Sequence, residues 1–184
     1  LETLKLDRAP FAVEAVPYGE DPTTWPRQAA AALDGIEGRL GGETRGLRFL
    51  ETRLIGQAVP GVELVPGDAV VAEVRGRKDA AEIAIMRRAV VAAETAVEKT
   101  VAQVREGMTE RELADELVAQ LRAAGSQDDL PFNPIVAFGE NSADPHAAPT
   151  GRKLRRGDLV LIDWGARIDG YASDLTRVFA FGEV

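Results

Sequence analysis

Hydrophobic and polar positions follow two different patterns along the chain and divide it near residue 75. Before that point, short stretches of helical spacing alternate with short apolar runs typical of strands. Such alternation predicts part of an α/β domain. The expected elements are helices at 22–34, 49–59 and 69–75, and strands just before Pro17 and at 62–65.

After residue 75 the pattern changes to two long amphipathic helices followed by strands. Asp79 with Glu82, and Thr109 with Glu112, have the spacing of capping boxes, which predicts two helix starts. Helices followed by antiparallel strands indicate an α+β arrangement, so the expected fold class is α/β plus α+β. The predicted helices are 80–105, with apolar positions 83, 86, 90, 93, 97, 101 and 104, and 111–124, with Leu113, Leu117 and Leu121; a strand follows at 132–138.

The stretch 158–182 predicts a β-hairpin. An apolar run ends on Asp163, the turn dipeptide Asp169-Gly170 follows, and a second apolar run follows Asp174. With a two-residue turn, Ile168 lies opposite Tyr171. The same register places Asp163 opposite Thr176, and Gly165 opposite Asp174.

The hairpin register gives Asp163 and Asp174 a common face. They become diagonal neighbours, roughly 7–8 Å apart at the backbone. Two carboxylates beside apolar sequence repel each other and resist desolvation, and a divalent cation would remove both costs. The alternative is an exposed hairpin with solvated aspartates. Geometry alone leaves both open, because changing the turn by one residue would put the carboxylates on opposite faces.

Composition narrows the function classes. The 184 residues are 45% hydrophobic and 28% charged, which is ordinary for a soluble globular protein. Thirty acids against 22 bases give a net charge of −8, which argues against nucleic acid or an anionic membrane as a partner. The absence of cysteine excludes disulfides and cysteine-based zinc sites and fits a cytoplasmic location. No apolar run approaches the ~18 residues of a transmembrane helix, and no signal peptide is evident.

The only histidine, His146, lies in the predicted loop 139–150. An imidazole there suits an acid, a base or a hydrogen-bond donor, and the alternative is an ordinary surface histidine. Ser142, Asp144 and His146 do not predict a serine triad, because no nucleophile-elbow pattern accompanies them.

Four motifs in residues 132–177 occur together. They are an N-P-I-V strand, an N-S-A-x-P-H loop, G-D-L-V-L-I-D-x-G and G-Y-x-S-D-x-T-R. This combination resembles the Xaa-Pro peptidases of the pita-bread metallopeptidase superfamily, aminopeptidase P and prolidase. Upstream, KDAAEIAIMRRA and GMTERELA resemble the first two helices of the same catalytic domain. The resemblance implies the N-terminal half of a pita-bread domain over 76–184, preceded by part of a creatinase-like N-terminal domain over 1–75.

The resemblance also implies roles for individual residues. Asp163 and Asp174 match the two aspartate ligands of a centre with two divalent ions, Mn²⁺ or Co²⁺, with Zn²⁺ as an alternative. His146 matches a non-ligand histidine that contacts substrate and assists proton movement. Thr176, opposite Asp163, is expected to hydrogen-bond to the metal site without being a metal ligand itself.

The implied activity is hydrolysis of the Xaa-Pro bond, at the N-terminus of peptides or in dipeptides, by a metal-bound hydroxide. The substrate would be a peptide with proline at the second position, and the protein is expected to be a homodimer.

The chain departs from the family pattern in its set of metal ligands. The family needs a further histidine and two glutamates as ligands, and this sequence holds no second histidine, so it carries two of five ligands. Because it begins with Leu1 and ends at Val184, we expect a piece of a longer protein. With two of the five ligands, this piece is expected to be inactive by itself. The alternatives are a catalytically inactive pita-bread protein that binds peptides or proteins, and a structural single-metal hairpin.

Overall fold

The structure is a computed structural model that describes residue 16 and residues 19–183. The strand expected before Pro17 falls largely outside these described residues. The chain separates into two compact units, Leu1–Arg77 and Lys78–Val184. The assignment of 1–75 and 76–184 to two named domains stays a prediction.

The first unit contains a βαβ arrangement. Strand β1 (Arg39–Gly42) and strand β2 (Glu63–Pro66) pair in parallel, with Leu40 opposite Leu64, and helix α3 (Phe49–Ala58) connects them. This confirms the α/β class predicted for this part of the chain. The remaining elements are η1 (Pro22–Thr24), α2 (Trp25–Ala32) and α4 (Asp68–Gly76).

Strand β1 was missed from the sequence because it is rich in glycine, which is depleted in strands. Glycines at positions 41, 42 and 67 explain where this strand lies. A Cβ on Gly67 would lie 3.0 Å from the carbonyl carbon of Gly41, and the amide of Gly67 donates to the carbonyl of Gly42 at 2.8 Å. The two backbones therefore approach more closely than side chains would allow.

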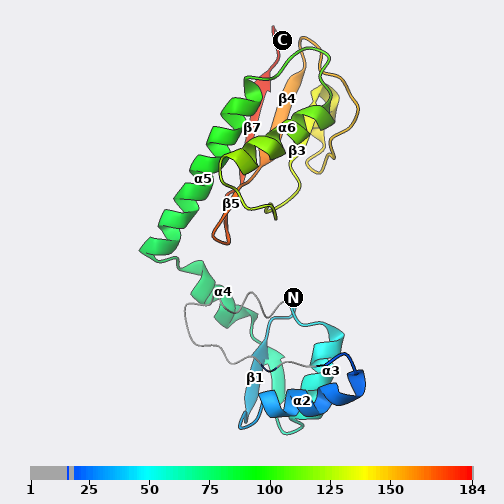
Figure 1. Cartoon of the computed structure of the whole chain (residues 1–184), viewed down its shortest axis with the longest axis vertical. Helices are drawn as coiled ribbons and strands as arrows, with labels where there is room; N and C mark the ends of the chain where they lie inside the picture. The colour runs from blue at the N-terminus through cyan, green and yellow to red at the C-terminus, as the bar shows by residue number, and fades with distance from the viewer. Residues whose placement is uncertain (1–15, 17–18, 184) are drawn as a thin grey trace. The chain divides into compact units, whose positions relative to one another are not determined.

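The second unit packs two helices against an antiparallel sheet (Figure 1). The three-stranded sheet has the order β3-β4-β7, with both pairs antiparallel, which confirms the α+β prediction. Its elements are α5 (Ala80–Val101), α6 (Glu110–Ala123), β3 (Ile135–Phe138), η2 (Gly139–Ala143), β4 (Leu159–Trp164), β5 (Arg167–Ile168), β6 (Tyr171–Ala172) and β7 (Leu175–Ala180).

Both predicted capping boxes are present. Asp79 accepts from the amide of Glu82 at 2.8 Å while Glu82 accepts from the amide of Asp79 at 2.7 Å. Thr109 and Glu112 form the equivalent pair at the start of α6. The boundaries at the other ends differ from the prediction. Helix α5 ends at Val101 rather than 105, and β3 begins at Ile135 rather than 132 because Pro134 has no N–H for the ladder.

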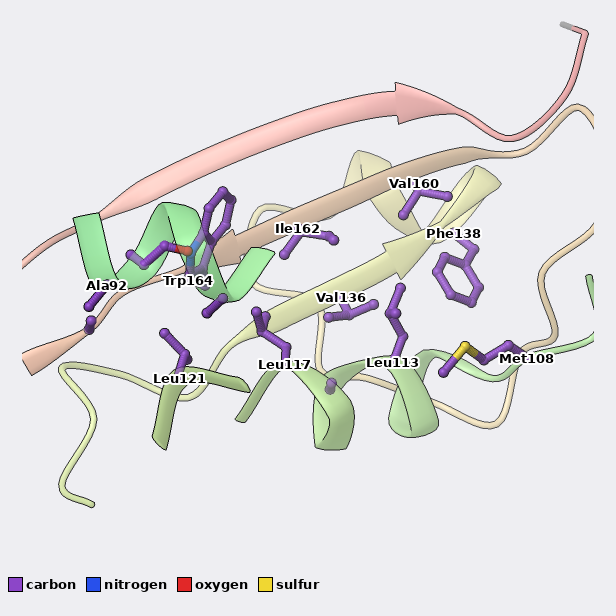
Figure 2. Packing of buried hydrophobic residues seen from close by; sticks show 14 of the residues in the cluster. Ala92, Met108, Leu113, Leu117, Leu121, Val136, Phe138, Val160, Ile162 and Trp164 are labelled. Carbon is purple, nitrogen blue, oxygen red and sulfur yellow. The ribbon is translucent and has the colours of Figure 1, made fainter. Parts of the chain in front are cut away.

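The core of the second unit lies between the sheet and the helices. Leu113, Leu117 and Leu121 of α6 are fully buried, as predicted, and point toward the strands (Figure 2). The strands contribute Val136, Phe138, Val160, Ile162 and Trp164 to the same core.

The buried face of α5 differs from the predicted apolar stripe. Of the predicted positions only Ala93 is fully buried, whereas Ile83 and Val101 are exposed. The buried face consists of small residues, which let the helix backbone approach the hairpin. They are Ala89, Ala92, Ala93, Ala96 and Thr100.

Among the described residues, no helix has both the length and the apolar character needed to cross a lipid bilayer.

Candidate metal centre

The hairpin has the predicted register. Asp169 and Gly170 form the turn with φ angles of 48° and 84°, the left-handed pair typical of a type I′ turn. Ile168 pairs with Tyr171, and Asp163 pairs with Thr176. The ladder is interrupted between the pair Trp164–Leu175 and the pair Arg167–Ala172, but the register is the same on both sides. Gly165 and Asp174 therefore lie at opposite positions of the two strands.

Gly165 makes that interruption possible. A Cβ at this position would lie 2.0 Å from the carbonyl oxygen of Ser173. Because no side chain fits there, only glycine allows the two strands to approach so closely beside Asp174. This gives a physical reason for a glycine two residues after Asp163.

Asp163 lies on the sheet face that points away from the helices. Along β4, Val160, Ile162 and Trp164 are buried in the core, while Leu159 and Leu161 share the alternate face with Asp163. On the paired strand, Val178 of this outer face is 53% exposed. The carboxylate therefore sits at the end of an apolar, incompletely covered sheet face.

The Oδ1 atom of Asp163 is buried and, among the described residues, has no hydrogen-bond partner. Thr176, although directly opposite, does not donate to this atom. Asp174 and Thr176 are exposed. A buried carboxylate oxygen without a donor is costly. A cation is the partner that such an acceptor-only group fits.

Helix α5 holds the neighbours of both aspartates through its backbone. The indole Nε1 of Trp164, next to Asp163, donates to the carbonyl of Ala93 at 2.9 Å. The hydroxyl of Ser173, next to Asp174, donates to the carbonyl of Ala89 at 3.1 Å. The same hydroxyl accepts from the amide of Ala166 at 3.0 Å. Sequence reasoning missed both residues, because contacts with helix carbonyls leave no periodic signal.

His146 is exposed in its loop, and its backbone amide donates to Asp144 Oδ1 at 2.8 Å. The hydroxyl of Ser142 donates to the carbonyl of Gly139 at 2.6 Å. Ser142 and Asp144 are thus engaged with backbone groups of the loop, in agreement with the absence of a triad pattern.

His146 lines an open surface groove of about 610 Å³ between its loop, helix α6 and the start of β3. Ile135 lines the same groove and is the Cα partner of Asp163 in the sheet. Ile135 thus borders both the groove of His146 and the strand that carries Asp163.

The second unit matches a known protein family. Residues 84–184 match the family model of metallopeptidase family M24. The chain belongs to this family. Membership implies a divalent metal cofactor for the M24 fold.

Individual relatives agree with the M24 assignment. The chain is 37% identical over 124 residues to the candidate dipeptidase YkvY of Bacillus subtilis, covering 67% of this chain and 34% of the relative. Among solved structures, the X-Pro aminopeptidase of Thermotoga maritima has a TM-score of 0.81 at 31% identity, covering 98% of this chain and 49% of that one. The prolidase of Thermococcus sibiricus has a TM-score of 0.83 at 29% identity, covering 99% and 50%.

The M24 chain described here spans about a third of the length of the curated relatives that it matches. It spans about half of the solved chains, consistent with a partial pita-bread fold. Within the described residues, no three His, Cys, Asp or Glu side chains form a group able to hold a metal ion. The assignment of Asp163 and Asp174 as metal ligands stays a prediction.

Proposed function

We propose that the protein hydrolyses the bond between a residue and a following proline, at the N-terminus of peptides or in dipeptides. Asp163 and Asp174 would hold two divalent cations, Mn²⁺ or Co²⁺ with Zn²⁺ as the alternative. Support comes from membership of family M24 and from structural likeness to an X-Pro aminopeptidase and a prolidase. The observation that carries the proposal is the buried Oδ1 of Asp163, which lacks a hydrogen-bond donor among the described residues.

When bound, the cations would supply an activated water and polarise the scissile carbonyl. The chain's own residues would bind and orient. Asp163 would be the less mobile ligand, because its strand is central in the sheet and Trp164 ties it to α5. Asp174 would approach the site from the exposed side of the hairpin, and Thr176 would hydrogen-bond to a ligand once the metals are in place.

His146 would contact the substrate and move a proton at its imidazole. Its exposure and its groove beside Ile135 suit a group that meets a peptide from solvent. Homodimerisation and a cytoplasmic location belong to the same proposal, and light scattering of the purified protein would test the former.

Metal titration tests the aspartate pair directly. Isothermal titration of the 184-residue chain with Mn²⁺ should give heat of binding that disappears in Asp174→Asn. Asp169→Asn is the matched control, because Asp169 lies on the same hairpin at the turn and should leave the heat unchanged. Equal heat from Asp174→Asn and the unsubstituted chain would refute the site.

Hydrolysis assays test the activity. The 184-residue chain alone should not cleave an Xaa-Pro dipeptide or tripeptide, because its described residues hold no three-ligand group. A longer protein that continues past Val184 with a histidine and two glutamates should cleave them when Mn²⁺ is added. A longer protein that binds such peptides without cleaving them would instead identify a binding module.

A further inference from the structure

Glu110 is a fully buried carboxylate that the metal centre does not use. It lies in the first turn of α6 with 0% of its surface exposed. Buried glutamates are rare unless their oxygens are paired. Glu110 is paired by four donors, which lie where the loop that carries His146 begins, at the end of β3, and where it ends, at Thr150.

The donors come from both ends of that loop. At its start, Oε1 accepts from the amide of Phe138 at 2.8 Å and from the side-chain amide of Asn141 at 2.9 Å. At its end, Oε2 accepts from the amide of Thr150 at 2.8 Å and from its hydroxyl at 2.5 Å. One carboxylate thus joins the two ends of the loop, with one oxygen for each end.

The backbone around Glu110 holds the same end of the loop. The amide of Glu110 donates to the carbonyl of Arg152, and the amide of Arg111 donates to the carbonyl of Thr150, both at 3.1 Å. These bonds satisfy two of the amides that a helix start leaves without intrahelical partners. Burial raises the pKa of Glu110, but the hydrogen bonds from Thr150, Phe138 and Asn141 outweigh it. The pKa therefore lies below its usual value, and the group is an anion at neutral pH.

We infer that Glu110 is the positioning residue of the His146 loop. By binding Phe138 and Asn141 with one oxygen and Thr150 with the other, it fixes the loop's two ends and hence the place of the imidazole between them. The functional meaning rests on the proposed role of His146 as the substrate-contacting group. The inference that the Glu110 anion sets the geometry of the loop does not depend on catalysis.

The single histidine makes the inference measurable in the 184-residue chain. Its imidazole gives one set of NMR signals, which reports only on His146. In Glu110→Gln, an amide NH₂ replaces one of the two oxygens, so the donors at one end of the loop lose their acceptor. We expect the His146 signals to move. We also expect hydrogen exchange of the Thr150 amide or the Phe138 amide to accelerate about tenfold to a hundredfold.

Glu112→Gln is the matched control, because Glu112 lies on the same helical turn but is exposed and bonds only to Thr109 among the hydrogen bonds described for it. It should leave the His146 signals and the Thr150 exchange rate unchanged. Thr150→Val is a second variant that keeps the side-chain shape but removes the hydroxyl, which donates to Glu110 and accepts from the amide of Arg152, so it tests the inference even if Glu110→Gln does not fold. Folded Glu110→Gln or Thr150→Val with unchanged His146 signals would overturn the inference.

The Mn²⁺ titration separates this inference from the proposed function. Loss of metal binding in Asp174→Asn with unchanged His146 signals in Glu110→Gln would remove the positioning role and keep the metal site. Shifted His146 signals in Glu110→Gln together with unchanged Mn²⁺ heat in Asp174→Asn would keep the positioning role and remove the metal site.

Discussion

Two carboxylates of the second unit, the fully buried Glu110 and the half-buried Asp163, differ in how their buried oxygens are paired. Both oxygens of Glu110 accept hydrogen bonds, from Phe138 and Asn141 on one side and Thr150 on the other. Asp163 keeps a buried oxygen without a donor among the described residues. A satisfied buried anion stabilises the chain that surrounds it, whereas an unsatisfied one costs stability. We interpret the first as structural and the second as reserved for a ligand.

The largest expected effect is a loss of stability when Glu110 is replaced. Glu110→Ala leaves four donors without their acceptor, so the free energy of unfolding should fall by about 3 kcal/mol or more. Denaturant unfolding measures it. Glu112→Ala, on the same turn, removes only an exposed capping contact and should cost less than about 1 kcal/mol. Equal losses in both variants would show that Glu110 is not a special anchor.

Replacement of Ser173 should have the next largest effect on stability. Because Ser173 is adjacent to Asp174, its replacement should also affect metal binding. Ser173→Ala removes the donor to the carbonyl of Ala89 and leaves the amide of Ala166 without its acceptor. We expect a loss of about 1–3 kcal/mol in unfolding free energy and a loss of roughly 10- to 100-fold in Mn²⁺ affinity. Ser142→Ala, whose hydroxyl bonds to the loop carbonyl of Gly139, should leave the Mn²⁺ affinity unchanged.

Asp163 should behave oppositely to Glu110 when no metal is present. Asp163→Asn removes the negative charge from a side chain whose buried oxygen lacks a donor, so the metal-free chain should gain about 1 kcal/mol of stability and lose its stabilisation by Mn²⁺. Asp158→Asn is the contrast, because Asp158 forms a two-point ion pair with Arg152 at 2.8 and 3.0 Å and should lose stability. A destabilised Asp163→Asn chain in the absence of metal would refute the assignment of Asp163 as a reserved ligand.

The smallest effect is a pH dependence. The folded-state pKa of Glu110 is lowered, so its stabilising contribution is fully present above about 4.5, the usual glutamate value, and is lost as pH falls through the folded pKa. Thermal melting should therefore show a gap between the unsubstituted chain and Glu110→Gln that narrows from roughly pH 6 to pH 3. A gap of constant size across this range would show that the charge of Glu110 contributes nothing.

The features predicted correctly depend on short-range chemistry. The capping boxes of Asp79 and Thr109 are contacts between residues three apart. The pairing of Asp163 with Thr176 follows from a two-residue turn and the alternation of side chains. Register could therefore be derived from the sequence before any site was known.

The features missed depend on distant partners. Glu110 meets Phe138 and Thr150 across 28 and 40 residues of chain, and no local pattern encodes such contacts. The buried face of α5 was predicted from its large apolar residues, but the structure buries its alanines. Large side chains there would keep Trp164 and Ser173 from reaching the carbonyls of the helix.

Those carbonyls have a consequence for the spacing of the two aspartates. Ala89 and Ala93 are four residues apart, so their carbonyls lie about 6 Å apart along the helix axis. Each accepts a hydrogen bond from the neighbour of one aspartate. A displacement of α5 as a rigid body would carry both attachment points together and preserve their separation. The separation of the two carboxylates is thus tied to the constant repeat of a helix backbone, and substitutions on the exposed face of α5 should leave it unchanged.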